Sequence, residues 1–360
     1  MKLMECPKYL GSLKSLHQSF PHWERLDGRT IFISGMSGMI GSFLADAIML
    51  RNEGLPPERW IRIIGMGRDK AAAQVRFGRW VNNEAFAFIA NDISNPINDL
   101  PFEPDYWIHA ASTTHPVAYA SEPINTILAN VLGTRSLLEM AARKRNSRFL
   151  LLSSVEIYGE NRGDTEYFTE DYCGYLDCNT LRAGYPEAKR TSEALCQAYI
   201  EQEGVDAAIL RLPRCYGPTM RGSDSKAAAQ FIKKAVNRED IVLKSAGTQL
   251  YSYAHVHDAV LGILWVLCAG ECGQAYNLGD KRSDITLKAL AETAARCAGT
   301  RVICQLPDDE TERKGYSTVS KALLDAGKLK KLGWTAHYDI AAGIKETIDI
   351  LRALDQEDKV

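Results

Sequence analysis

Three regularly spaced glycines constrain what this chain can fold into more than any other feature of its 360 residues. Gly35, Gly38 and Gly41 lie between an apolar run over 30–33 and a helical pattern over 42–49. Glycine permits a tight turn from strand to helix and lets the backbone approach a pyrophosphate, which then meets the free N–H groups of the helix N-terminus. A tight corner without a ligand is the alternative for a glycine motif alone. The flanking patterns favour a dinucleotide-binding turn.

Strand and helix patterns alternate along the next part of the chain. The predicted strands cover 61–64, 85–90, 106–110, 149–153 and 207–212, and the predicted helices cover 127–144 and 185–202. Such alternation argues for a parallel sheet that is covered by helices on both faces. The sequence therefore predicts the α/β class, with a Rossmann doubly wound parallel sheet.

The alternation becomes irregular after Leu212. Helical patterns over 231–236 and 287–298 are mixed with strand-like runs over 241–243 and 302–305. We predict a smaller mixed substrate-binding domain here, over the carboxyl edge of the sheet. The expected division is an N-terminal extension at 1–28, a Rossmann dinucleotide-binding domain at 29–215 plus 252–280, and a substrate-binding domain at 216–251 plus 281–360.

Composition argues against several other classes. A net charge of -2 offers no basic field for nucleic acid or an anionic membrane. No run approaches the roughly 18 apolar residues of a membrane span, and the first residues hold no long apolar run, so we expect no signal peptide. The nine cysteines form no Cys-x-x-Cys pair, which indicates reduced thiols and a cytoplasmic protein. His255 and His257 share a strand face without a third ligand, so we expect no metal.

Arg68 bears on the choice between NAD and NADP as cofactor. A carboxylate for the ribose 2′-hydroxyl usually ends the second strand of a nucleotide-binding domain. Gly65 stands at that place in this chain, and Arg68 follows closely. A guanidinium there suits a 2′-phosphate, whereas stacking on adenine or exposure to solvent is the alternative. Both NAD and NADP stay open at this point.

Tyr185 and Lys189 lie four residues apart in a predicted helix, and therefore on one helical face. A phenol with a pKa of about 10 is a poor base at neutral pH. A nearby ammonium and a positive nicotinamide ring would lower that pKa. Ser154 follows the predicted strand over 149–153, where its hydroxyl can hydrogen-bond a reacting alcohol or carbonyl. Surface residues and a helix cap are the alternatives for these positions taken singly.

The order Gly-x-x-Gly-x-x-Gly, Ser-x-x-x-Tyr-Gly, Tyr-x-x-x-Lys resembles the extended short-chain dehydrogenases/reductases, and among them the NAD-dependent nucleotide-sugar epimerase/dehydratase family. Further matches extend over nearly the whole chain after residue 28: Asp92-Ile93, His109 to Ser112, Asn130, Tyr216 to Pro218 and Val256 to Asp258. The resemblance implies cofactor contacts from Asp92, Ile93, Ala110, Ala111 and Ser112. It implies that Tyr185 is the acid/base, with Lys189 and Ser154 assisting.

The resemblance implies an enzyme that takes a hydride from a nucleotide-sugar, usually at the 4-position, and later returns it. The transient 4-ketone permits epimerisation, dehydration or decarboxylation. Glu156 favours a decarboxylase-like or 4,6-dehydratase-like lyase, because both kinds of enzyme carry glutamate at this position. The segment from Arg182 to Arg190 is most similar to UDP-glucuronate decarboxylases. A nucleotide-sugar 4-epimerase, which is an isomerase, and a net NADP-dependent reductase are the alternatives, and an ion-paired surface carboxylate is the alternative for Glu156.

The chain departs from the family pattern where the substrate is expected. The family usually has an asparagine shortly before its Tyr-Gly-Pro, where this chain has Arg214. An arginine that normally grips the diphosphate falls at Tyr251. Arg214 or Lys226 is the candidate for replacing that cation, and ordinary solvated surface is the alternative. We therefore expect Arg214, Lys226 and Tyr251 to line the substrate site.

The resemblance also implies a homodimer. It places the helices over 127–144 and 185–202 in a four-helix interface between two copies. We expect the packed face to consist of apolar side chains on these helices, namely Leu137, Leu138, Leu195 and Tyr199.

Overall fold

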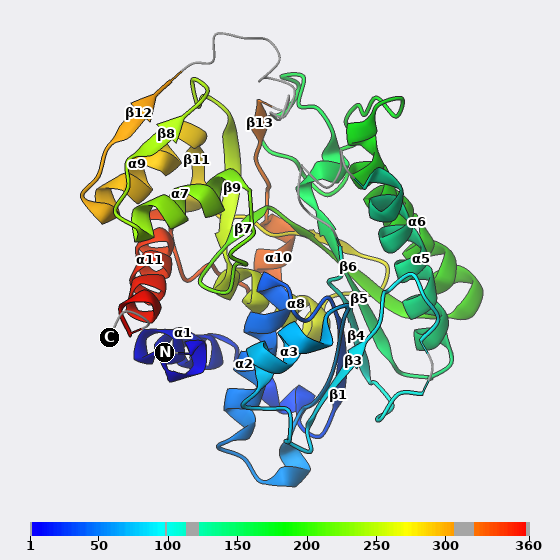
Figure 1. The fold of residues 1–360 in the computed structure, drawn as a ribbon. Coiled ribbons are helices and arrows are strands. Elements are labelled where there is room, and N and C mark those ends of the chain that lie inside the picture. Colours follow the sequence, from blue (N-terminus) through cyan, green and yellow to red (C-terminus); the bar gives the residue numbers. More distant parts are fainter. Residues whose placement is uncertain (1, 98, 113–121, 306–319, 358–360) are drawn as a thin grey trace.

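A seven-stranded parallel sheet forms the centre of the protein (Figure 1). The computed structural model describes residues 2–97, 99–112, 122–305 and 320–357. The strands follow the order β10-β6-β5-β4-β1-β2-β3, and neighbours run parallel. The order reverses between β1 and β4, the place where such sheets bind ligands. The strands are β1 (Thr30–Ser34), β2 (Arg62–Gly67), β3 (Phe86–Ala90), β4 (Tyr106–His109), β5 (Arg148–Ser154), β6 (Asp206–Leu212) and β10 (Ala275–Asn277).

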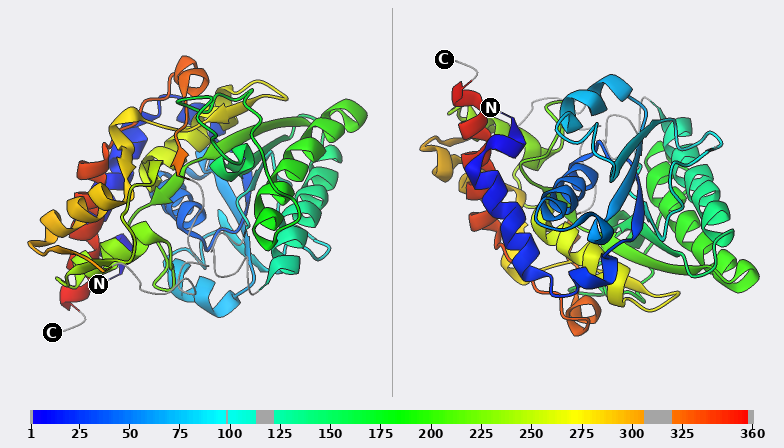
Figure 2. Two further views of the ribbon diagram at one scale, coloured as in Figure 1. Left: turned by 90° about the horizontal axis from the view of Figure 1, so that it is seen from above. Right: turned by 90° about the horizontal axis from the view of Figure 1, so that it is seen from below.

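Helices cover both faces of this sheet (Figure 2). Ile31 and Ile33 of β1 share a core with α2 and α8, whereas Phe32 shares one with α5 and α6. Successive side chains of a strand point to opposite faces, and both faces are buried, so the run from Ile31 to Ile33 is apolar without interruption. The helices of this part are α2 (Met39–Asn52), η3 (Pro57–Arg59), α3 (Lys70–Phe77), α5 (Pro123–Ala142), η4 (Val155–Tyr158), η5 (Leu181–Ala183), α6 (Gly184–Glu203) and α8 (Val256–Ala269).

The N-terminal extension forms a helical layer outside α2. It consists of η1 (Leu3–Glu5), α1 (Pro7–Ser19) and η2 (Trp23–Leu26). Tyr9, Leu13 and Leu16 recur at helical spacing and are buried in the same core as α2 and α8. The Tyr9 hydroxyl donates a hydrogen bond of 2.6 Å to the carboxylate of Asp46 in α2. The extension is therefore an integral part of the packed core.

The remainder of the chain forms smaller sheets and helices with a core of their own. β7 (Arg214–Tyr216) and β13 (Lys321–Ala322) pair in parallel with β9 (Leu250–His255), and β11 (Asp284–Thr286) pairs with β9 antiparallel. The other elements are α7 (Ala227–Val236), β8 (Ile241–Leu243), η6 (Lys281–Ser283), α9 (Leu287–Ala298), β12 (Val302–Cys304), α10 (Gly327–Lys331) and α11 (Ile340–Glu357). β9 runs directly into α8, so the domain boundary expected between 251 and 252 falls inside a strand.

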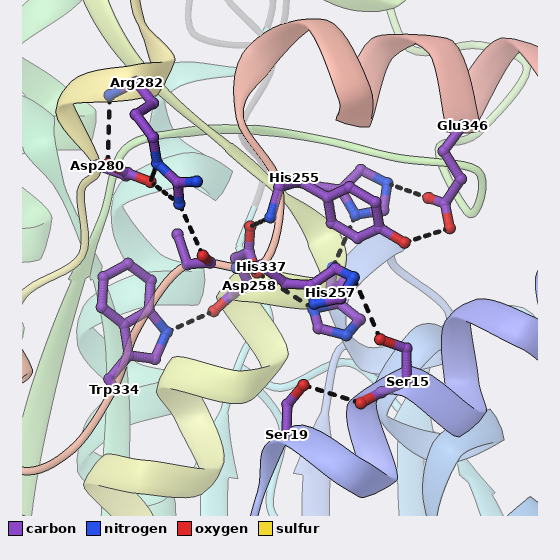
Figure 3. Close-up of polar contacts among 12 residues, drawn as sticks. Ser15, Ser19, His255, His257, Asp258, Asp280, Arg282, Trp334, His337 and Glu346 are labelled. Atoms are coloured by element: carbon purple, nitrogen blue, oxygen red, sulfur yellow. Dashed lines mark hydrogen bonds and ion pairs between the residues drawn. The ribbon is translucent and has the colours of Figure 1, made fainter.

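A polar cluster lies where these parts meet (Figure 3); its residues His255, His257 and Asp258 are buried, Glu346 is partly buried and His337 is exposed. We call it the polar junction; it consists of His255, His257, Asp258, His337 and Glu346. His255 Nε2 lies 3.1 Å from the carboxylate of Glu346, and His257 Nδ1 lies 3.1 Å from that of Asp258. The hydroxyl of Ser15 in α1 lies 3.3 Å from Nε2 of His337. The polar junction thus connects β9 and α8 with α11 and with the N-terminal extension.

The predicted fold class is confirmed, and each predicted strand of the main sheet is present. The helix predicted over 127–144 begins earlier, at Pro123, and ends at Ala142. Leu137 and Leu138 are fully buried within the protomer, so their assignment to a dimer face is wrong. The cause is that α6 packs against α5 inside one chain. None of the helices described is both long and apolar enough to cross a membrane.

Candidate active site

The glycine turn joins β1 to α2 through positions that exclude side chains. Gly35 has a φ of +68°, and a Cβ there would lie 2.7 Å from Cα of Ala111. A Cβ at Gly41 would lie 2.7 Å from Cα of Met36. Gly38 is the N-cap of α2, so the free N–H groups of that helix begin directly after the turn. Because this turn carries no side chains at the glycines and leads into a helix N-terminus, it fits the pyrophosphate of a dinucleotide.

Ser34 ties the glycine turn to the next strand of the sheet. Its Oγ accepts hydrogen bonds of 3.1 Å from the backbone N–H groups of Ala110 and Ala111, and it lies 2.8 Å from Nδ1 of His109. The segment from Ala110 to Ser112, expected to line the cofactor, is therefore held beside Gly35. Burial lowers the pKa of His109 to about 3, so its ring is neutral. The sequence analysis missed Ser34, although its place as the last strand residue before the glycines is a usable signal.

The end of β2 differs from the expectation. The strand continues past Gly65 to Gly67, so Gly65 does not end it. The side chain of Met36 fills the space beside Gly65, since a Cβ there would clash with it. Arg68 follows the strand at an exposed position. The carboxylate of Asp69 caps α3 by accepting a hydrogen bond of 2.9 Å from the N–H of Ala72.

Asp92 and Ile93 follow β3 and have different surroundings. The Asp92 carboxylate is partly exposed and accepts a hydrogen bond of 2.9 Å from the N–H of Ser94. Ile93 is buried against α5, where a Cβ on Gly133 would lie 2.7 Å from its side chain. The Asp92 side chain is therefore partly accessible to solvent, whereas the Ile93 side chain belongs to the core.

Tyr185 and Lys189 lie at the start of α6 and are both buried. Burial raises the pKa of Tyr185 to about 12; hydrogen bonding with Ser154 and Ser112 lowers this pKa, and the charge of Glu156 raises it. Burial lowers the pKa of Lys189 to about 8, and its ammonium donates a hydrogen bond of 2.8 Å to the carbonyl of Leu152. These residues keep Tyr185 as a neutral phenol, so a further positive charge is needed for it to act as a base.

Ser154, at the end of β5, and Glu156, in the η4 helix that follows, both lie close to Tyr185. The Ser154 hydroxyl caps η4 by accepting a hydrogen bond of 3.2 Å from the N–H of Glu156, and it also hydrogen-bonds Tyr185. Ser112 contacts Tyr185 as well, which links the segment beside the glycine turn to the tyrosine. The structure therefore gathers Ser112, Ser154, Glu156 and Tyr185 in one site.

Arg214 of β7 lies beside Glu156, with its Nη2 at 3.4 Å from the carboxylate Oε1. Its guanidinium carbon stands 3.5 Å from the centre of the Tyr251 ring on β9. Arg214 and Tyr251 thus form one stacked unit next to the tyrosine site.

Lys226 is the N-cap of α7 and precedes the first turn of that helix. Its ammonium is 3.5 Å from the carboxylate of Asp224, and the side chain is partly exposed. Burial raises the pKa of the Cys215 thiol to about 12, and the charge of Lys226 lowers it. Lys226 therefore lies near enough to Cys215 to act on it electrostatically.

No cluster of His, Cys, Asp and Glu side chains in the described ranges is arranged to hold a metal ion. All nine cysteines are free thiols.

A dinucleotide cradle at β1, together with a buried Tyr-x-x-x-Lys pair and a serine at the end of β5, defines an enzyme of the short-chain dehydrogenase/reductase class. Residues 31–279 match the model of the NAD dependent epimerase/dehydratase family. The chain belongs to this family, as the sequence analysis predicted.

Curated relatives match nearly the whole chain. The chain is 30% identical over 340 residues to UDP-glucuronic acid decarboxylase 4 of Arabidopsis thaliana, which covers 94% of this chain and 72% of that protein. It is 28% identical over 345 residues to UDP-glucuronic acid decarboxylase 1 of Xenopus tropicalis, which covers 94% of this chain and 76% of the other. These relatives share the decarboxylase description.

Solved structures of the same fold include two epimerases. The UDP-glucose 4-epimerase of Thermotoga maritima, solved with UDP-glucose, has a TM-score of 0.74 and 20% identity and covers 90% of this chain and 99% of its own. The UDP-glucuronic acid 4-epimerase of Bacillus cereus, in complex with UDP-glucuronic acid and NAD, has a TM-score of 0.73 and 21% identity, with the same coverage of 90% and 99%. At these identities the likeness establishes the fold.

Proposed function

We propose that this protein is an NAD-dependent decarboxylase of a nucleotide-sugar, with UDP-glucuronate as substrate, that acts through a transient 4-keto sugar. The observation that carries the proposal is the placement of Glu156 beside Ser154 and Tyr185 at the end of β5. The curated relatives, which are UDP-glucuronic acid decarboxylases matching 94% of the chain, support the choice of reaction. A 4,6-dehydratase and a 4-epimerase differ from it in the fate of the ketone.

Four residues form what we call the catalytic cluster: Ser154, Glu156, Tyr185 and Lys189. The Tyr185 oxygen takes the proton of the sugar 4-hydroxyl, while the Ser154 hydroxyl donates a hydrogen bond to the same sugar oxygen. The Lys189 ammonium favours the phenolate form of Tyr185. NAD, when bound, accepts the hydride from C4 and returns it at the end, so the cycle is redox-neutral.

Glu156 serves the steps beyond the ketone. A 4-ketone makes the neighbouring C5 carboxylate labile: the C5–C6 bond breaks, CO₂ leaves, and the electron pair stays behind in an enolate. That enolate takes a proton at C5 before the hydride returns to C4. Glu156 is a carboxylate close enough to Tyr185 to change its pKa, so it lies where such a proton moves.

The cofactor is held at the glycine turn. We assign the pyrophosphate to Gly35, Gly38 and Gly41 and the N-terminus of α2, and the nicotinamide end to the segment from Ala110 to Ser112. Asp92, the backbone of Ile93 and Arg68 are assigned to the adenosine end. NAD is preferred to NADP because the family is NAD-dependent and because structures of the same fold contain NAD. Mass spectrometry of the cofactor released from purified protein checks this choice.

The substrate-binding domain is proposed to supply the remaining contacts. Lys226, at the start of α7, is the candidate for the diphosphate. Tyr251 and Arg214 form the wall next to Glu156. We keep the division of the chain at 29–215 plus 252–280 and 216–251 plus 281–360 as a proposal, because substrate would lie between these two parts.

We also propose a homodimer through α5. Exposed apolar side chains recur at helical spacing along this helix, at Ile124, Ile127, Leu128 and Leu132. Such an apolar stripe on a helix surface fits a second copy of the same face. Analytical ultracentrifugation checks this: the wild-type protein is expected to sediment as a dimer and Leu128→Asp as a folded monomer. A monomeric wild-type protein at micromolar concentration would contradict it.

We place the protein in the cytoplasm. The support is that all nine cysteines are free thiols, which is typical of a reducing compartment. Fractionation of the native cells, followed by detection of the protein with an antibody, tests this placement.

Product analysis tests the proposed reaction. The holoenzyme is incubated in turn with UDP-, GDP-, CDP- and dTDP-sugars, including UDP-glucuronate, and products are identified by NMR. We expect UDP-glucuronate to yield a UDP-pentose and CO₂. A six-carbon product with an inverted C4 would instead identify a 4-epimerase, and a 4-keto-6-deoxy sugar from a neutral hexose would identify a dehydratase.

A further inference from the structure

Arg214 is a cation whose bonding within the chain is incomplete. Nη2 contacts Glu156 at 3.4 Å, and the guanidinium lies over the ring of Tyr251. Nη1 is buried and has no hydrogen-bond partner among the residues that the structure describes. A buried donor without an acceptor costs the free energy of its desolvation, so a native structure normally provides an acceptor for it. A ligand is one source of such an acceptor.

The neighbours of Arg214 show which part of a substrate it meets. Arg214 contacts Glu156, and Glu156 acts electrostatically on Tyr185, the acid/base of the proposed reaction. The guanidinium is therefore only one side chain removed from the tyrosine site. Lys226, at the N-terminus of α7, is linked to Tyr185 in a similar way, through Cys215. Arg214 has in addition a buried donor that lacks an acceptor among the described residues, so we assign Arg214 to the reacting sugar.

We propose that Arg214 binds the carboxylate of the sugar ring and makes the site selective for nucleotide-activated uronic acids over neutral sugars. The inference rests on the proposed function, because it takes the substrate to be a nucleotide-sugar. A guanidinium carries five donors in a rigid fork, so it can serve Glu156 along one edge and a second carboxylate along another. A neutral sugar offers only a hydroxyl at this place, which is a weaker acceptor.

Tyr251 holds the guanidinium plane in position. β7 and β9 run parallel with Arg214 opposite Tyr253, and from this register the Arg214 side chain reaches over the ring of residue 251. Stacking on an aromatic face stabilises a cation and limits its rotation. The edge of the guanidinium that does not contact Glu156 therefore keeps a fixed orientation.

Binding measurements separate this role from the alternatives. Each variant is made in a Tyr185→Phe background, which blocks turnover, and holoprotein is titrated with UDP-glucuronate and with UDP-glucose by calorimetry. Tyr185→Phe alone is expected to prefer UDP-glucuronate. Adding Arg214→Gln is expected to weaken UDP-glucuronate binding by roughly 10- to 100-fold and UDP-glucose binding by less than about threefold. Arg214→Lys, which keeps the charge but loses the fork, is expected to retain part of the preference.

Arg162 provides the matched control. It also stacks on a tyrosine, with its guanidinium carbon 4.1 Å from the Tyr175 ring centre, and pairs with Glu160 at 3.5 Å. Its side chain is 59% exposed, whereas that of Arg214 is 22% exposed. Arg162→Gln is therefore expected to leave both dissociation constants unchanged. Retention of NAD and an unchanged melting temperature show that a variant is folded.

Three outcomes would overturn the inference. Equal weakening of both ligands by Arg214→Gln would mean that Arg214 binds the diphosphate or supports the site generally. A Tyr185→Phe protein that shows no preference for UDP-glucuronate over UDP-glucose would also contradict it. A Tyr185→Phe protein that binds neither UDP-glucuronate nor UDP-glucose would contradict both the proposed function and this inference. Arg214-dependent binding of UDP-glucuronate without release of CO₂ by the wild-type enzyme would refute the decarboxylase alone and leave this inference standing.

Discussion

The protein contains two clusters of titratable side chains that are buried in part, and their carboxylates have different surroundings. In the polar junction, Asp258 accepts hydrogen bonds from the backbone N–H groups of His337 at 2.8 Å and Tyr338 at 3.1 Å. Glu346 there accepts a hydrogen bond of 2.6 Å from the Tyr338 hydroxyl. In the catalytic cluster, Glu156 contacts Arg214 and its side chain stays 32% exposed. The carboxylates of the polar junction face hydrogen-bond donors of the fold, whereas Glu156 of the catalytic cluster stays accessible to solvent.

The difference shows that a perturbed pKa does not by itself identify a functional site. Burial lowers the pKa of His257 in the polar junction, as it lowers that of Lys189 in the catalytic cluster. The catalytic cluster lies at the carboxyl end of β5, where open α/β sheets bind ligands. The polar junction lies between α1, α8 and α11, whose relative positions it fixes. Changes in the first are expected to lower turnover, and changes in the second to lower stability.

Removing the Tyr185 hydroxyl of the catalytic cluster, and separately the Tyr338 hydroxyl that bonds Glu346 of the polar junction, gives the largest expected contrast. Tyr185→Phe removes the proton-transfer group, and kcat should fall by roughly 10²- to 10⁴-fold with NAD binding retained. Tyr338→Phe removes a hydrogen bond to a buried carboxylate, which should lower the free energy of unfolding by about 1.5–3 kcal/mol and leave kcat unchanged. Steady-state kinetics and urea denaturation of both variants measure this. A comparable loss of turnover in the two variants would contradict the assignment of catalysis to one cluster and stability to the other.

The pH dependence of stability sharpens the comparison at the catalytic cluster. Burial lowers the pKa of Lys189 from 10.5 to about 8. Below pH 8 both states are protonated, and the folded state bears the full cost of the buried ammonium. Between pH 8 and 10.5 the unfolded chain binds more protons, so the free energy of unfolding should rise with pH, by up to about 3 kcal/mol.

Urea denaturation of cofactor-free protein at successive pH values measures that rise. Lys189→Met removes the titrating group and serves as the reference, because every other group stays in both proteins. The wild-type curve is expected to climb above pH 8 relative to the variant. Parallel curves over this range would mean that Lys189 is not destabilised by burial.

Asp258→Asn is expected to have a smaller effect, confined to stability. The substitution keeps the shape of the side chain but removes the charge that accepts from the N–H groups of His337 and Tyr338. We expect the free energy of unfolding to fall by about 1–3 kcal/mol, with kcat and KM unchanged. A change in KM for the nucleotide-sugar would show that the polar junction communicates with the substrate site.

Local features of the site were predictable from the sequence, because they depend on spacing along one element. The glycine turn lies between a strand and a helix, and Tyr185 and Lys189 share a face through a four-residue interval in α6. The polar junction was not predictable, since His255, His337 and Glu346 come from separate elements and meet only through tertiary packing. Hydrophobic spacing locates the buried face of a helix without telling which partner covers it.

The dimer face and Arg214 illustrate the same limit. The spacing of Leu137 and Leu138 correctly indicates burial, but the covering surface is the central sheet together with α6 of the same chain. The contact between Arg214 and Tyr251 depends on the pairing of β7 with β9, which short strands in a mixed region do not reveal. Residues of one element were therefore easier to assign than contacts between elements.

The central claim is that the enzyme forms a ketone at the catalytic cluster and uses Glu156 for the later steps of the reaction. Glu156→Gln keeps the shape of the side chain and removes its ionisation, whereas oxidation needs only Ser154, Tyr185, Lys189 and NAD. Holoenzyme is mixed with UDP-glucuronate in a stopped-flow instrument, and reduced cofactor is followed by its absorbance at about 340 nm. Glu156→Gln should accumulate reduced cofactor to near one equivalent per site and release little CO₂. Full product formation by this variant without reduced cofactor would contradict the account and favour a 4-epimerase.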